Sequence, residues 1–266
     1  MIKLGVNSVL FAGLDFAAAA KTIKACGYDG IEVSAISGMC EHLVLDRWQE
    51  QGEEVRRIAA DNGLALLSME VASLDSARLE KAFAAGKALG IPIINVGPGG
   101  KSDIEEDLVR QIGVIAAAAE RAAAYGVTLC CKAHVGGSIY STPTTLRAMA
   151  KIACPAFGVD MDPSHIYRAG ELPEKALPAV IGRVKHIHIR DCKGKGPSPG
   201  DARDQACGRG EINLAGYCKA MVDGKYDGPV CLEVIGAGKY DLAERAIIAA
   251  ESYGYLNACL KALGAR

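Results

Sequence analysis

The chain has 266 residues, and its 30 Lys and Arg residues nearly balance its 31 Asp and Glu residues, leaving a formal net charge of −1. Because the basic residues are scattered and not in excess, the composition argues against a nucleic-acid partner. No apolar run reaches the roughly 18 residues of a membrane span, and the N-terminus lacks the pattern of a signal peptide. The sequence therefore predicts a globular, cytoplasmic protein with a large buried core.

Short apolar runs rich in β-formers alternate with longer helical patterns, which is typical of repeated βα units around a parallel sheet. The predicted strands cover Ile2–Val6, Gly30–Val33, Leu64–Met69, Ile91–Val96, Val127–Cys131, Phe157–Met161, Val184–Ile189 and Pro229–Val234. The predicted helices cover about 15–26, 46–62, 76–89, 104–125, 142–152, 173–181, 214–223 and 241–263. This strict alternation favours a single closed (β/α)8 TIM barrel over residues 1–266 rather than an open doubly wound sheet.

The ten cysteines have no CxxC spacing and mostly lie in apolar segments, so we expect reduced, buried thiols. Cys192 and Cys207 are the candidates for exposure, because they flank or lie in the long irregular segment Gly194–Ile212. An irregular segment of that length inside a compact domain is usually functional or mobile.

The C-terminal ends of the strands in such a barrel meet at one face and supply the catalytic residues. Two apolar runs within Val159–Asp191, FGVDMDPSH and RVKHIHIRD, both end in clusters of His and Asp. The candidates at all strand ends are Asn7, Glu32, Ser68, Glu70, Lys132, His134, Asp162, His165, His188, Arg190 and Glu233. Asp, His and Glu from neighbouring strands form a mixed oxygen and nitrogen site suited to Mn²⁺, Mg²⁺, Zn²⁺ or Fe²⁺.

Each candidate also has a structural interpretation. Asp162 before Pro163 is equally explained as a turn or cap residue, and His188 as a hydrogen-bonded core histidine. Glu233 in a core strand needs a cationic or metal partner, since an unpaired buried carboxylate is costly. The GPGG segment, Gly97–Gly100, is either a plain βα turn or a turn whose N–H groups approach a phosphate, although it lacks the Lys-Ser/Thr of a P-loop.

The motifs GVDMDPSHIYRAG, KHIHIRD, GRGEINLAGY and PVCLEV resemble the xylose isomerase-like TIM barrel superfamily, which includes sugar-phosphate isomerases and epimerases, inosose dehydratase and endonuclease IV. The resemblance extends over nearly the whole chain. It implies a divalent metal held by a Glu, an Asp, a His and a Glu at strands five to eight, and Asp162, His188 and Glu233 match the last three. It also matches His165 to a substrate-contacting histidine and places Arg190 among the substrate-binding groups.

The chain departs from the family pattern at strand five. Where the pattern reads L-x-x-E-x-H, this chain reads LCCKAH, with Lys132 at the Glu position and His134 retained. Two hypotheses follow. A metal binds through Asp162, His188 and Glu233, with Lys132 as an acid, base or substrate ligand; or the Lys132 ammonium takes the place of the metal and polarises the carbonyl itself.

The resemblance implies a sugar or keto-polyol isomerase or epimerase that moves a proton next to a carbonyl. Glu233, Lys132 and His165 would be catalytic, and the substrate-binding residues would be His134, Arg190, Glu32 and Asn7. The alternatives are a dehydratase of a keto-polyol such as an inosose, and a sugar-binding barrel without catalysis. The expected partner is a small sugar or polyol; its identity, its phosphorylation and homo-oligomer formation stay open. DNA repair is disfavoured by the five histidines and the near-neutral charge.

Overall fold

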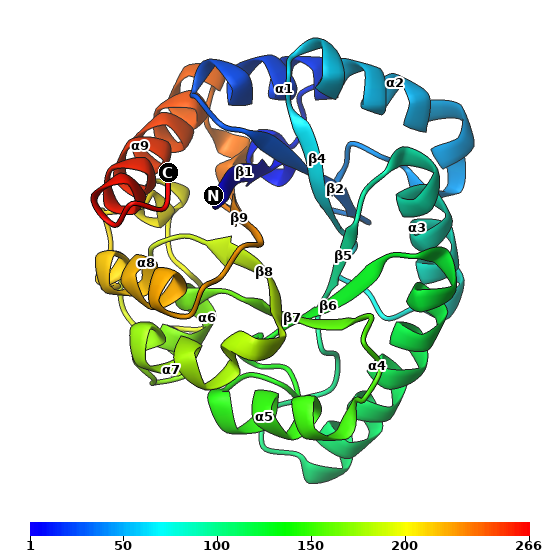
Figure 1. Ribbon diagram of the computed structural model, residues 1–266. Helices are drawn as coiled ribbons and strands as arrows, with labels where there is room; N and C mark the ends of the chain where they lie inside the picture. The colour runs from blue at the N-terminus through cyan, green and yellow to red at the C-terminus, as the bar shows by residue number, and fades with distance from the viewer.

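Eight parallel strands close into a barrel in the computed structural model, which describes residues 1–266 (Figure 1). The ring consists of β1 (Lys3–Asn7), β2 (Gly30–Ile36), β4 (Ala65–Glu70), β5 (Ile93–Val96), β6 (Thr128–Lys132), β7 (Phe157–Met161), β8 (Val184–Ile189) and β9 (Pro229–Leu232). It closes because β1 pairs in parallel with both β2 and β9. A short strand, β3 (Cys40–Glu41), adds an antiparallel pairing to the end of β2. The predicted (β/α)8 barrel is confirmed.

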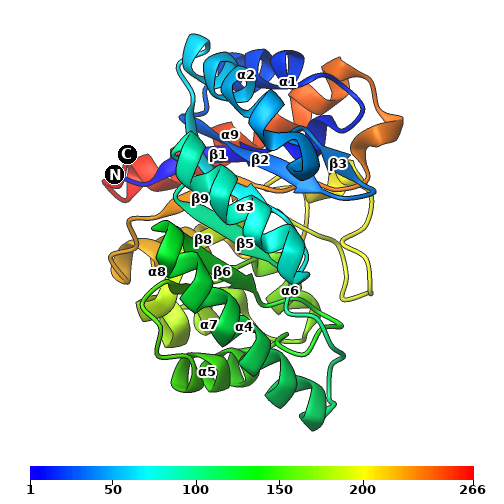
Figure 2. The same ribbon diagram turned by 90° about the vertical axis from the view of Figure 1, so that its right-hand side faces the viewer.

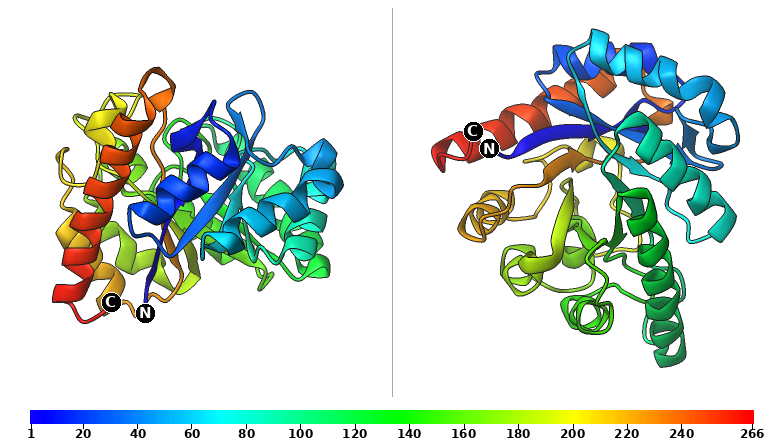
Figure 3. Two further views of the ribbon diagram at one scale, coloured as in Figure 1. Left: turned by 90° about the horizontal axis from the view of Figure 1, so that it is seen from above. Right: turned by 45° about the vertical axis from the view of Figure 1, so that its right-hand side comes forward.

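Helices cover the outside of the ring (Figures 1 and 3). They are α1 (Phe16–Ala25), α2 (Trp48–Asp61), α3 (Ser76–Leu89), α4 (Glu105–Tyr125), α5 (Thr142–Lys151), α6 (Pro163–Arg168), α7 (Pro173–Val180), α8 (Leu214–Asp223) and α9 (Leu242–Ala262). The predicted elements differ from these bounds by three residues at most. The sequence analysis missed β3 and α6, which are too short to show a periodic pattern. None of the helices has the length and apolar character needed to cross a membrane.

Local signals fix several helix ends. Asp15 caps α1 by accepting a hydrogen bond from the Ala18 N–H, and Asp75 does the same for α3 through the Arg78 N–H. At the other end of α3, Gly90 has a φ of 73°, a left-handed conformation that favours glycine. These caps satisfy backbone groups that the helices leave unpaired, so local sequence determines where α1 begins and where α3 begins and ends.

The two chain ends lie together at the N-terminal end of the barrel (Figure 2). The Ile2 N–H donates to the Ala265 carbonyl, and Arg266 forms an ion pair with Asp29. The long segment between β8 and α8 lies at the opposite end, where the C-terminal ends of the strands meet (Figure 2). The candidate site is therefore at the face of the barrel away from both termini.

The segment between β8 and α8 folds back onto the barrel around Asp191. One carboxylate oxygen of Asp191 accepts from the Cys192 and Ile212 N–H groups, and the other accepts from the Gly208 N–H. Cys192 and Cys207, the two candidates for exposure, are both buried. All ten cysteines are free thiols, as expected.

Candidate functional site

The interior of the barrel is filled by polar side chains where an ordinary barrel has layers of branched aliphatic residues. Each of these side chains is no more than 5% exposed. They are Asn7, Glu32, Ser68, Glu70, Asn95, Lys132, Asp160, His186, His188 and Glu233. Because buried polar groups are stable only when they are paired, their contacts show what the site can do.

The deeper part of the interior is a network of histidines and carboxylates. In His188, Nδ1 lies 2.6 Å from Asp160 Oδ2 and Nε2 lies 2.5 Å from Glu32 Oε2. Burial by itself lowers the pKa of His188, but Asp160 and Glu32 outweigh it and raise this pKa well above its usual value. His188 is therefore an imidazolium that donates from both ring nitrogens. His186 lies beside it, with Nδ1 2.9 Å from Asp160 Oδ1.

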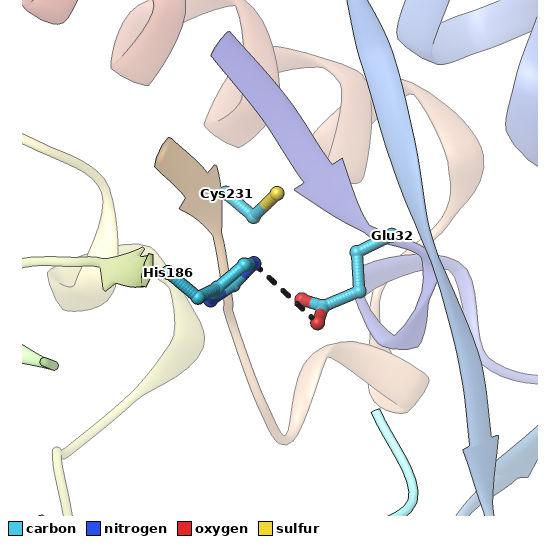
Figure 4. Close-up of side chains that lie close together, drawn as sticks. All are labelled: Glu32, His186 and Cys231. Carbon is cyan, nitrogen blue, oxygen red and sulfur yellow. Dashed lines mark ion pairs between the residues drawn. The ribbon is translucent and has the colours of Figure 1, made fainter. Parts of the chain in front are cut away.

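Three groups of side chains in this region could ligate a metal by proximity. They are Glu32, His186 and Cys231; Asp160, His186 and His188; and Glu32, Glu70 and His188. Figure 4 shows the first group, in which His186 Nε2 faces Glu32 at 3.7 Å. Burial raises the pKa of Cys231 well above its usual value, so this residue remains a thiol.

The upper part of the site is centred on the Lys132 ammonium, at the end of β6. Its Nζ lies 2.9 Å and 3.0 Å from the two carboxylate oxygens of Glu233, 3.8 Å from Glu70 Oε2 and 4.0 Å from Asp160 Oδ2. Burial lowers the pKa of Lys132, but these carboxyl groups, Glu233 first, raise it to a net value above the usual one. Lys132 is thus a fixed positive charge.

Two carboxyl groups on either side of Lys132 differ in protonation. Burial raises the pKa of both, but for Glu233 the charges of Lys132, His188 and Arg190 outweigh burial and lower the pKa below its usual value. For Glu70 burial dominates and raises the pKa to about 8, and its Oε2 accepts no hydrogen bond. At neutral pH Glu233 is ionised and Glu70 is mostly protonated.

A cavity of about 590 Å³ opens above these groups at the C-terminal ends of the strands. Its ionisable wall residues are Glu70, Lys132, His134, His165, Arg168, Arg190 and Glu233. Six of the eleven candidates from the sequence therefore meet at one cavity: Glu70, Lys132, His134, His165, Arg190 and Glu233.

The other five candidates do not line it. Asn7, Glu32, Ser68, Asp162 and His188 are each 0% exposed and lie beneath the cavity floor or in the barrel wall. Asn7 Oδ1 caps the 3-10 turn that follows β1. Asp162 is the N-cap of α6, where it accepts from the Ser164 N–H, and it also forms an ion pair with Arg190 at 2.8 Å. Asp162 and Glu233 both contact Arg190 Nη2, at 2.8 Å and 3.3 Å, whereas His188 pairs with Glu32 and Asp160.

His165 lies between two guanidinium groups on the cavity wall. Its Nδ1 is 2.9 Å from Arg168 Nη2, and its Nε2 is 2.9 Å from Arg190 Nη2. Burial, followed by the charge of Arg190, lowers the pKa of His165 well below its usual value. The ring is therefore neutral. The His134 ring packs against it with a centroid distance of 3.9 Å.

A family model described as xylose isomerase-like TIM barrel matches residues 20–259. The chain belongs to this family. Similar solved structures include D-psicose 3-epimerase in the presence of D-fructose, with 17% identity, coverage of 97% of this chain and 99% of that one, and a TM-score of 0.79. D-allulose 3-epimerase from Methylomonas sp. has 17% identity, 97% and 98% coverage and a TM-score of 0.76.

A third similar structure is the probable 3-DHS dehydratase AsbF from Bacillus anthracis, with 15% identity, 96% and 99% coverage and a TM-score of 0.74. No curated protein matches the sequence. At these identities the similarity establishes the shared fold.

Within this family fold, Arg168 is the ionisable cavity residue that sequence reasoning missed. It lies at the end of α6, three residues after His165, and is 7% exposed. Residues three apart share a helix face, so recognising a helical turn after DPSH would have placed Arg168 beside His165. That turn begins with Pro163 at its first position and Asp162 as its cap, which are recognisable start signals.

Proposed function

We propose that the protein is an isomerase or epimerase that moves a proton at the carbon next to the carbonyl of a small sugar or keto-polyol. The observation that supports this proposal is the Lys132 ammonium at the cavity wall, between an ionised Glu233 and a protonated Glu70. Neighbouring carboxyl groups with opposite protonation states form an acid and base pair. The ammonium supplies the positive charge that an enolate oxygen needs.

The roles follow from the contacts. Lys132 donates to the substrate carbonyl oxygen, and Glu233 removes the proton from the adjacent carbon. In the free protein Lys132 and Arg190 hold the pKa of Glu233 low, which makes it a weak base. When Lys132 turns an N–H toward the substrate oxygen, Glu233 loses part of that stabilisation and becomes more basic. Glu70 returns a proton, while His165, His134 and Arg190 orient hydroxyl groups.

The residues as they lie do not fit the divalent ion that the resemblance implies. Lys132 stands at the first ligand position, and His188 has no free ring nitrogen because both nitrogens donate to carboxylates. Three cations, Lys132, His188 and Arg190, already lie among the four carboxylates Glu32, Asp160, Asp162 and Glu233. A divalent ion among these groups would lie close to three buried cations, and their repulsion is unfavourable in a site with little water. We therefore favour the metal-free form of the mechanism.

Dehydration is the second candidate, because the two carboxyl groups are not equivalent. Elimination needs one base and one acid, and a protonated Glu70 can donate its proton to a departing hydroxyl group. The similarity to a probable 3-DHS dehydratase is consistent with this outcome. A sugar-binding barrel without catalysis is the third.

Solvent-deuterium exchange into a panel of ketoses and keto-polyols, followed by NMR, tests these candidates. Exchange with a new stereoisomer supports the proposal, and loss of a hydroxyl group supports dehydration. Saturable binding without exchange or turnover contradicts both and favours the binding barrel. Lys132→Met and Glu70→Gln should each slow exchange by about 10²- to 10⁴-fold, the range of general acid and base catalysis. Lys193→Met, at an exposed lysine outside the cavity, is the matched control.

A further inference from the structure

Arg168 is a buried cation on the cavity wall that forms no ion pair. Its Nε donates to the Ser164 carbonyl, Nη1 to the Pro197 carbonyl and Nη2 to His165 Nδ1. None of the three acceptors is a carboxylate. The two other cations of the wall do have carboxylates: Lys132 contacts Glu233 and Arg190 contacts Asp162. Of these three cations, only Arg168 has no carboxylate in direct contact.

Two N–H groups of the Arg168 guanidinium have no acceptor in the protein. A guanidinium carries five N–H groups, and the three acceptors leave an N–H on each of Nη1 and Nη2 without a protein partner. Arg168 is 7% exposed and remains charged at neutral pH. A buried charge with free donors is costly unless an anion compensates it, so the position favours an anionic ligand.

No acidic side chain forms an ion pair with Arg168, although burial, which lowers its pKa, is partly opposed by the nearby buried Asp162 and Glu233, which raise it. The acidic residues of the cavity are Glu70 and Glu233, and both belong to the Lys132 end of the site. The glycine segments Gly97–Gly100 and Gly136–Gly137 line the same cavity. The N–H groups of Gly97, Gly99 and Gly100 donate to no protein acceptor, and no Cβ shields them. Backbone N–H groups in such turns suit anions.

We infer that the substrate carries a carboxylate or phosphate group that binds Arg168, while its carbonyl end lies at Lys132. A continuous chain of contacts joins the two ends: Arg168 to His165, His165 to Arg190, Arg190 to Glu233 and Glu233 to Lys132. The inference rests on the proposed function for the carbonyl end alone. Anion binding at Arg168 is a separate equilibrium property of the protein.

Matched polyols test the inference without any turnover. D-glucitol, D-gluconate and D-glucitol 6-phosphate share one carbon skeleton, and the second and third carry a carboxylate or a phosphate. We expect isothermal titration calorimetry to show that at least one anion binds about 10- to 100-fold more tightly than D-glucitol, the factor carried by a charge-assisted hydrogen bond. The tighter of the two anions identifies the kind of group. Equal binding of all three polyols, or no binding of either anion, overturns the inference.

Arg168 also donates a hydrogen bond to the Pro197 carbonyl, so removing it changes both the charge of the cavity and the support of that segment. Different variants distinguish these two effects. Arg168→Gln should abolish the preference for the anion, while Arg168→Lys should keep a measurable part of it. Arg203→Met, at an exposed arginine of the same segment, is the control and should leave the preference unchanged. A preference that survives in Arg168→Gln, or that Arg203→Met also removes, contradicts the assignment. If the wild-type protein shows no preference for the anions but still exchanges deuterium into neutral ketoses, the inference is rejected and the proposed function is retained.

Discussion

Replacing Lys132 by Met should destabilise the protein in a strongly pH-dependent way. Lys132 and Glu233 are 4% and 5% exposed and form a direct ion pair. Breaking a buried pair by removing one partner typically costs about 3 to 5 kcal/mol. Arg190 Nη2 still lies 3.3 Å from Glu233 Oε2 and compensates part of the charge, so we expect the lower end of that range.

Protonation of Glu233 sets an upper limit to this loss. In the variant the Glu233 carboxyl group can take up a proton instead of remaining charged. Relative to the unfolded chain, whose Glu pKa is about 4.3, this protonation costs about 1.4 kcal/mol for each pH unit above that pKa. The limit is therefore about 4.4 kcal/mol at pH 7.5 and about 1.6 kcal/mol at pH 5.5. We expect a loss of about 2 to 4 kcal/mol at pH 7.5 and about 1 kcal/mol at pH 5.5.

The sign follows from the direction of each shift. In the wild type the pKa of Glu233 is lowered, so its contribution is fully present above the unfolded pKa and does not change between pH 5.5 and 7.5. In the variant, burial without Lys132 raises the pKa of Glu233, so stability falls as the pH rises through this window. Glu70 is mostly protonated in both proteins and its effect cancels in the difference.

Urea unfolding followed by circular dichroism at the two pH values measures the loss, provided that the m-values of the two proteins agree. Lys239→Met, which removes an exposed lysine paired with Asp201, is the control and should show little change at either pH. An equal loss for Lys132→Met at both pH values, or no loss at pH 7.5, would refute the reasoning that a buried ion pair holds Glu233 ionised.

Three further measurements test other parts of the site. The raised pKa of Glu70 means that the folded state keeps a proton that the unfolded state releases. The free energy of unfolding of the wild type should therefore fall by up to about 1.4 kcal/mol per pH unit between about pH 5 and 8. Urea unfolding should show a flatter slope for Glu70→Gln. Arg190→Leu should cost about 3 to 5 kcal/mol, since it leaves the fully buried Asp162 unpaired, and unfolding measurements that show less than 1 kcal/mol would contradict the ion pair. Incubation with a chelator, followed by elemental analysis and the deuterium-exchange assay, should leave activity and thermal unfolding unchanged; loss of both with release of a stoichiometric metal would contradict the metal-free mechanism.

The sequence predicted the strands well because their signals are local. Apolar runs bounded by capping residues and glycines determine where β7 and β8 begin and end, and both were predicted at their observed bounds. The same local information showed that Asp162 is either a ligand or a cap, and the structure shows that it caps α6. It failed where a residue's environment is set by distant segments. Cys192 and Cys207 follow β8 in an irregular segment. They are buried because that segment folds back onto the barrel, through hydrogen bonds around Asp191 and from the Cys207 N–H to Ser252.

The sequence by itself determined the barrel and the presence of a lysine at the end of its fifth strand, because alternation and strand-end position are properties of contiguous residues. Only the tertiary structure decided which charges neutralise each other. Lys132 and Glu233 are 101 residues apart, and His188 and Glu32 are 156 residues apart. The protonation of Glu70 and the unpaired charge of Arg168 likewise depend on burial and on neighbours from other strands. The physical reason is that electrostatic energies in a buried site depend on distances across the barrel. Those distances are determined only when the sheet closes.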